Sequence, residues 1–135
     1  MGLITEIGGI VGNAIVMLKS HAELKSIVGD RIYNNVPQDT VYPYIKATSG
    51  SIAVLGDKSE QVFSQILSFN CWSEHHGDKE CFEIMDYINC ILTNKTIISG
   101  QDVSTICLNI ESIDTFIEQN GNIHHSVLKM KHIFS

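Results

Sequence analysis

Residues 62–92 read VFSQILSFNCWSEHHGDKECFEIMDYINCIL, and the spacing of apolar residues changes partway along this stretch. The first part alternates, with Phe63, Leu67, Phe69 and Cys71 on one face and Val62, Ile66 and Trp72 on the other. After Trp72-Ser73-Glu74 the apolar positions become Phe82, Met85, Ile88 and Leu92, which form one stripe of a 3.6-residue period. The stretch therefore predicts a strand that leads into a helix covering the sheet.

The composition predicts one domain, residues 1–135, because 135 residues with 44% hydrophobic and 18% charged side chains suit a single core. The formal net charge of −6 argues against nonspecific binding to nucleic acid, which needs Lys and Arg to neutralise phosphates. DNA is therefore not expected as a bound ligand. An acidic wall could instead let a polyanion slide past without sticking.

The N-terminal segment predicts a helix rather than a signal peptide or a membrane span. Residues 1–19 are apolar, but Glu6 interrupts them and no basic segment precedes them. One helical stripe holds Ile4, Ile7, Val11, Ala14, Ile15, Leu18 and Ala22. Ser20 is the expected N-cap of a short helix over residues 21–27, which Gly29 ends.

The remaining strands are expected to form two hairpins. A short strand is predicted at residues 31–35 and another at residues 96–99. Long strands are predicted at residues 44–55, 62–73, 103–114 and 123–134, with turns at residues 56–60 and 119–122. The fold class is therefore α+β: an antiparallel sheet of about four long strands, with an N-terminal helix and one central amphipathic helix on one face.

Histidine and cysteine positions do not predict a metal site, and no cofactor is expected. Cys71, Cys81, Cys90 and Cys107 form no C-x-x-C pair and are expected to be buried free thiols. His75 and His76 are expected in a solvated loop, because the neighbouring cysteines lack zinc spacing. His124 and His125 should face opposite sides of a strand.

The sequence contains no recognisable catalytic motif, so no enzyme is expected. Gly8-Gly9-Ile10-Val11-Gly12 lacks the order and context of a phosphate-binding loop. The carboxylates at positions 74, 78, 80 and 83 suit the start of a helix through its dipole better than they suit acid/base chemistry. A small hydrolase that uses Ser73, His75 and Asp78 is the weaker alternative.

Surface contacts with a partner are expected at two places. Trp72 ends its strand beside Ile66, where packing within the subunit is the ordinary expectation, and contact with a partner subunit is the sharper one. Long hairpins leave edges that oligomerisation would cover. The residues assigned to a subunit or partner interface are Gly56, Asp57, Lys58, Glu60 and Trp72.

Three segments in order resemble a known family. They are Leu24-Lys25-Ser26-Ile27-Val28-Gly29-Asp30-Arg31-Ile32-Tyr33, Tyr42-Pro43-Tyr44-Ile45, and Leu67-Ser68-Phe69-Asn70-Cys71-Trp72-Ser73 before a helix. The closing strand, residues 127–134, continues the pattern. Together they resemble the tail completion, or tail terminator, proteins of long-tailed bacteriophages and gene transfer agents, over about residues 14–134. Asn70-Cys71 departs from the usual aliphatic or acidic pair before the Trp.

The resemblance implies a structural virion protein without catalysis. Such a protein forms a ring, expected to be hexameric, on the last ring of tail tube protein and presents a surface to the head connector or stopper protein. DNA passes through the ring without being specifically bound, and no membrane is involved. The implied location is the particle neck, after assembly in the bacterial cytoplasm. The alternative is a head-side stopper or adaptor protein, or another non-enzymatic interaction module of a prophage or gene transfer agent.

Overall fold

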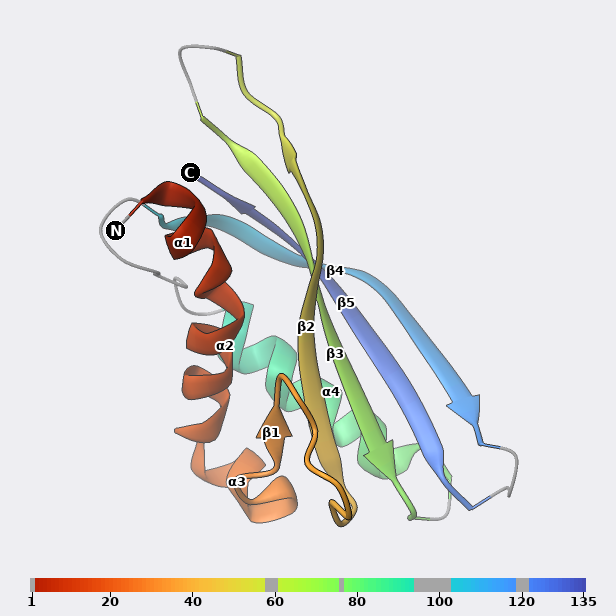
Figure 1. Ribbon diagram of the computed structural model, residues 1–135. Helices are drawn as coiled ribbons and strands as arrows, with labels where there is room; N and C mark the ends of the chain where they lie inside the picture. Colours follow the sequence, from red (N-terminus) through yellow and green to blue (C-terminus); the bar gives the residue numbers. More distant parts are fainter. Residues whose placement is uncertain (1, 58–60, 76, 94–102, 119–121) are drawn as a thin grey trace.

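The structure is a computed structural model that describes residues 2–57, 61–75, 77–93, 103–118 and 122–135 (Figure 1). Its helices are α1 (Leu3–Gly8), α2 (Ile10–Lys19), α3 (Ala22–Val28) and α4 (Lys79–Thr93). Its strands are β1 (Ile32–Tyr33), β2 (Tyr44–Val54), β3 (Phe63–Ser73), β4 (Thr105–Ile117) and β5 (His124–Phe134). The short strand predicted at residues 96–99 lies outside the described residues.

The strands form one sheet in the order β1-β2-β3-β5-β4. The α+β class and both hairpins are confirmed, since β2 pairs with β3 and β4 pairs with β5, all antiparallel. The two hairpins join through an antiparallel β3–β5 ladder. The sheet has five strands rather than about four, because the short β1 adds to the β2 edge, and it does so in parallel.

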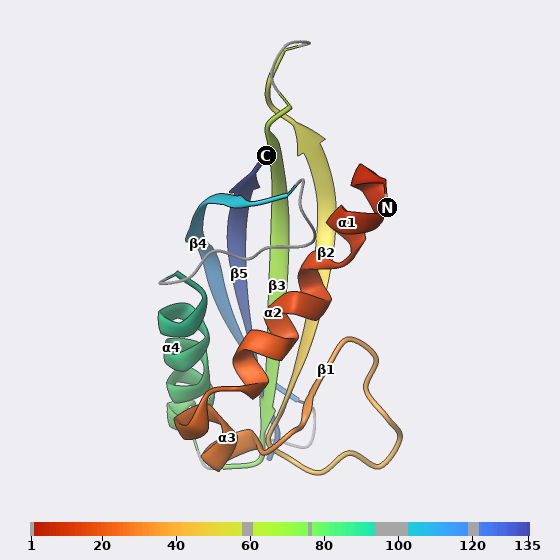
Figure 2. The same ribbon diagram turned by 90° about the vertical axis from the view of Figure 1, so that its left-hand side faces the viewer.

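The helices all lie on one side of the sheet, as Figure 2 shows, and the core fills the space between the two layers. In β3 the odd-numbered residues from Phe63 to Ser73 are buried and the even-numbered ones are partly exposed. The alternation predicted for this strand is therefore confirmed, with Leu67, Phe69 and Cys71 facing the helices. The opposite side of the sheet carries none of the described helices and is called the open face below.

The N-terminal helical stretch breaks at Gly9, which ends α1 and caps the start of α2. The expectation that Ser20 caps the next helix is wrong: Ser20 ends α2, and His21 caps α3 by accepting a hydrogen bond from the Leu24 amide. Gly29 ends α3 at φ 61°, a value that suits glycine.

Among the described residues, no single helix has the length and apolar character to cross a membrane. The pair formed by residues 3–19 and 22–28 meets the criteria of length and composition only jointly, with a 93° bend between its parts. Ile10, Ala14 and Leu18 of that pair are buried in the core described above.

Strand β4 is less regular than its sequence alternation predicts. Its register against β5 shifts between Thr105 and Cys107 and again between Ile110 and Ser112. Each shift places an extra residue on β4, which is typical of a β-bulge and changes which face the following side chains occupy. The strand therefore carries apolar residues toward solvent on both faces.

Candidate interaction surfaces

The edge strand β4 exposes the largest group of apolar side chains in the described chain. Helix α4 packs over β3, β4 and β5, but β4 is the last strand, and no other strand of the described chain pairs with its outer side. The exposed apolar residues on it are Ile106, Ile110, Ile113, Phe116 and Ile117. An edge of this length with apolar side chains is a template for pairing with another chain.

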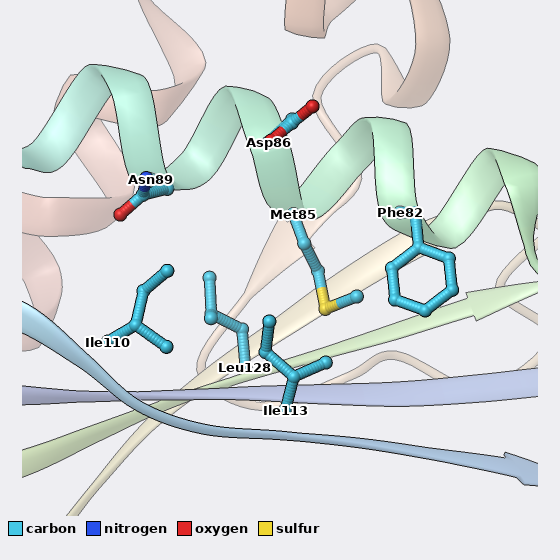
Figure 3. Close-up of a pocket in the computed structure, with 7 residues that line it drawn as sticks. All are labelled: Phe82, Met85, Asp86, Asn89, Ile110, Ile113 and Leu128. Carbon is cyan, nitrogen blue, oxygen red and sulfur yellow. The ribbon is translucent and has the colours of Figure 1, made fainter.

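A groove separates α4 from β4 on the helix side of the sheet (Figure 3). It encloses about 230 Å³ and is lined by Phe82, Met85, Asp86, Asn89, Ile110, Ile113 and Leu128. Figure 3 shows the Met85 and Phe82 side chains pointing from the helix toward the strands, with Ile113 and Leu128 pointing back. The Phe82 ring remains 45% exposed, so the groove is an apolar surface open to solvent.

The β2–β3 hairpin extends beyond the helices as an arm, seen at the top of Figures 1 and 2. From Ser49 to Val54 every residue of β2 is exposed, including Ile52 and Val54. Gly56 and Asp57, both assigned to an interface from the sequence, lie at its tip beside a cleft of about 560 Å³. Lys58 and Glu60, assigned with them, lie outside the described residues, and the interface assignment stays a prediction.

Trp72, the fifth assigned residue, stands in a row of aromatic rings on the open face. Its indole lies between the Tyr44 ring, with centroids 5.0 Å apart, and the His125 ring, with centroids 4.3 Å apart. Tyr42 extends the row on one side and Phe116 extends it on the other. The row joins β2, β3, β5 and β4, so Trp72 packs within the subunit while one side remains partly exposed.

The two adjacent histidines of β5 face opposite sides, as predicted. His124 is buried on the helix side, where its Nδ1 lies 3.0 Å from Asp78 Oδ1 at the start of α4. His125 lies on the open face, where its Nε2 lies 3.0 Å from Asn70 Oδ1. The first contact joins β5 to the start of α4, and the second joins β5 to β3.

A third histidine, His132, is fully buried between polar neighbours. Its Nε2 is 2.7 Å from Thr105 Oγ1 and its Nδ1 is 3.4 Å from Gln65 Oε1. A neutral ring satisfies both contacts when Nδ1–H donates to Gln65 and Nε2 accepts from the Thr105 hydroxyl. Burial lowers the pKa of His132 to about 4, so the ring is neutral at physiological pH.

The acidic residues at the start of α4 are engaged in structural contacts. The Ser73 hydroxyl donates to Glu80 Oε1 at 2.6 Å and accepts from the His75 amide at 3.0 Å. Asp78 is held by His124 as described above. The Ser73 hydroxyl therefore directs its proton to Glu80, whereas the hydrolase alternative requires it to donate to a histidine ring.

The cysteines divide into two pairs. Cys71 and Cys81 are buried, and the Cys81 thiol lies 3.7 Å from the Cys71 carbonyl oxygen. Burial raises the pKa of both thiols, most strongly that of Cys71, which keeps them protonated. Cys90 and Cys107 are exposed, so the expectation that all four are buried is wrong for these two. Within the described ranges, no three His, Cys, Asp or Glu side chains are placed to hold a metal ion.

Sequence reasoning missed the aromatic row and the polar contacts between elements. These contacts join residues that are far apart in the chain, such as Asp78 and His124 or Gln65 and His132. The only local signal was the position of Trp72 at the end of its strand. The exposed apolar side chains of β4 were also not predicted, because regular alternation would place about half of the β4 isoleucines on the buried face.

Comparisons with known proteins agree on one family and one fold. Residues 15–135 match the family model described as Tail completion protein gp17. A chain in "Virion of native gene transfer agent (GTA) particle" superposes with a TM-score of 0.85 at 13% identity, covering 95% of this chain and 96% of that chain. The chain in "Structure of bacteriophage SPP1 gp17 protein" superposes with a TM-score of 0.62 at 16% identity, covering 96% and 90%. No curated protein sequence matches.

Proposed function

The chain belongs to the tail completion protein gp17 family, and from that premise we propose that it caps the tail tube of a phage or phage-like particle as a ring of six copies. Residues 1–135 act as one unit in this role. The ring stops tube growth and joins the tail to the head connector or stopper protein. The partners are therefore further copies of the chain, the tail tube protein and the connector.

The apolar edge of β4 is the observation that supports a ring. Phe116 is 51% exposed and Ile117 is 64% exposed. Burying apolar surface yields about 25 cal/mol per Å², so a strand with five such residues favours association. A contact between two different surfaces repeats from copy to copy and closes into a ring when its rotation divides a full turn.

The charge supports passage of DNA rather than binding. The net charge of −6 gives the ring a negative field, and a negative wall repels phosphates. Asp57 and Glu60 are our candidates for residues that face the lumen, alongside the interface role of Gly56, Lys58 and Trp72. Replacing both acids by lysine should make the ring retain DNA at low salt.

The role requires no catalysis. The candidate Ser73, His75 and Asp78 are engaged in contacts that hold β3, β5 and α4 together. His75 contacts Ser73 through its backbone amide, which an alanine keeps, so His75→Ala should leave assembly unchanged. The protein resides in the neck of the particle and in the cytoplasm of the producing bacterium before assembly.

Size measurement of the purified protein tests the ring. We expect monomers that assemble with rising concentration, or a hexamer, when light scattering follows gel filtration. Adding purified tail tubes should place the protein at one tube end by immunogold labelling. A compact dimer that is insensitive to concentration contradicts a ring. Labelling of purified heads in place of tubes would instead identify a stopper or adaptor.

A further inference from the structure

The sheet has two free edges, and they lie at opposite ends of the strand order. Among the described residues, no strand pairs with the outer side of β4. On the other side, β1 pairs only with Ile45 and Lys46 of β2, and the Asn34 side chain donates to the Ala47 carbonyl oxygen. From Thr48 to Val54 the outer side of β2 is therefore open.

The directions of the two free edges suit each other. β2 is antiparallel to β3, β3 to β5 and β5 to β4, so β2 and β4 run in opposite directions within one subunit. A second copy placed beside the first in the same orientation would bring its β2 along β4 as an antiparallel neighbour. Such a contact joins two different surfaces, as a ring requires.

The apolar side chains of the two edges lie on the same side of the sheet. Ile52 and Val54 pair with Gln65 and Phe63, which are buried on the helix side. Ile110 and Ile113 pair with Met130 and Leu128, which are also buried there. Joining the edges would form one continuous apolar strip on the helix side of the sheet. The strip would adjoin the groove of Figure 3, which lies between α4 and β4.

The β2 edge also has room for incoming side chains. A cleft of about 470 Å³ opens between the N-terminal helices and β2, lined by Gly8, Val11, Gly12, Asn34, Thr48 and Ser49. β2 carries one extra residue, between Ser49 and Ile52, and one of the two extra residues on β4 lies between Ile110 and Ser112. With Ile52 of one copy opposite Ile110 of the next, Ser49 meets Ile113 at the mouth of this cleft, and the two bulges coincide.

The same alignment brings opposite charges together on the open face. It places Asp114 of one copy opposite Thr48 of the next, two residues along β2 from Lys46 and therefore diagonally across from it. Lys46 and Asp114 lie on the open face through their pairing with Asn70 and Val127. Neither is in an ion pair in the described part of the chain. The alignment therefore matches direction, apolar face and charge at once.

We propose that successive copies of this chain join edge to edge, with the free part of β2 (Thr48–Val54) pairing antiparallel to β4 around Ile110. The inference rests on the proposed ring and identifies the strands that build it. Main-chain hydrogen bonds supply the ladder, and the groove between α4 and β4 accepts the aliphatic side chains of the neighbouring arm.

A mixing experiment with two variants tests this contact. Ile110→Asp spoils only the β4 edge and Ile52→Asp only the β2 edge. Both residues are partly exposed, at 47% and 43%, so the fold should persist and circular dichroism should match the wild type. Each variant alone should be monomeric at concentrations where the wild type associates, with the dissociation constant raised at least about tenfold. An equimolar mixture should form a 1:1 dimer and nothing larger, because only one intact pair of edges remains.

The controls make the outcomes distinct. Val16→Asp places the same charge on an exposed apolar position of α2, outside both edge strands, and should associate like the wild type. Should either edge variant misfold, Val54→Asp replaces Ile52→Asp and Ile113→Asp replaces Ile110→Asp. A mixture that stays monomeric overturns the proposal, as does a wild type that stays monomeric at about 1 mM. Dimers formed by Ile52→Asp alone would also overturn it, because they indicate β4 pairing with β4.

A charge exchange gives independent support. Lys46→Glu and Asp114→Lys should each weaken association, and the double variant should regain it, with all three differences shrinking at high salt. Lack of rescue contradicts the alignment. Rings that form although the mixture fails would refute this contact and leave the tail role intact. Normal tails in cells lacking the gene would refute the tail role and leave the contact intact.

Discussion

The Trp72 indole and the His125 imidazole stack nearly parallel, at 9° with centroids 4.3 Å apart. They are direct partners in the β3–β5 ladder, which joins the two hairpins of the sheet. The sheet that presents both free edges therefore depends on this seam. Tyr44 and Phe116 extend the stack to β2 and β4, the two strands that carry those edges.

A double-mutant cycle measures the contribution of this stack. Trp72→Ala and His125→Ala should show a coupling free energy of about 0.5–1.5 kcal/mol in urea unfolding, because stacked rings stabilise beyond the area they bury. Trp72→Phe keeps a ring in place and should retain part of the coupling. Losses that simply add would show that the stacking contributes nothing.

Stability should fall with acid because of His132. Its folded-state pKa of about 4 lies below the ordinary 6.5, so folding favours the neutral ring. The associated stability is complete above about pH 6.5 and is lost as the pH falls toward 4, by about 3 kcal/mol. Urea midpoints between pH 7 and pH 4 should fall less steeply for His132→Gln than for the wild type. Equal slopes for the variant and the wild type would exclude this role for His132.

The contact between Asp78 and His124 should stabilise the start of α4. Asp78→Ala removes a 3.0 Å contact to a buried ring and should cost about 1 kcal/mol of unfolding free energy. Asp86→Ala is the matched control, since this carboxylate is exposed on the same helix and should change stability by less than about 0.5 kcal/mol. Hydrogen exchange should show faster opening at the first turn of α4 in the first variant only. Equal stability of the two variants would show that the contact between Asp78 and His124 does not stabilise the helix.

Substitutions at Ile113 and Leu128 should distinguish an effect on association from an effect on folding. They are partners across β4 and β5, but Ile113 is 45% exposed whereas Leu128 is buried. Leu128→Ala should cost about 2–5 kcal/mol, as large-to-small core changes do. Ile113→Ser should cost less than about 1 kcal/mol while weakening association in sedimentation measurements. If Ile113→Ser unfolds the protein and leaves association unchanged, the edge is structural rather than an interface.

The change of period between residues 62 and 92 predicted the centre of the fold correctly. Alternation in β3 and the stripe in α4 both follow from burial on a single side, which a linear pattern records directly. The antiparallel hairpins followed from polar turns between long strands. These features are local, so the sequence carries them without any long-range information.

The remaining features depend on contacts between distant segments. The short strand predicted at residues 31–35 is present as β1, but its parallel pairing with β2, in which Ile32 meets Ile45, could not be read from the sequence. The bulges of β4 arise from its register against β5, so the exposure of Ile110 and Ile113 could not be read from alternation. Ser20 was favoured as a cap by residue type, but His21 occupies that position in the chain.

The central claim is that this chain completes the tail of a phage or phage-like particle. Electron microscopy of particles from cells that lack the gene, beside cells in which it is restored, tests the claim most directly. We expect tubes without heads and of irregular, often excessive length in its absence, and normal joined particles on restoration. Tails of normal length attached to heads at the wild-type frequency, without the gene, would contradict the claim.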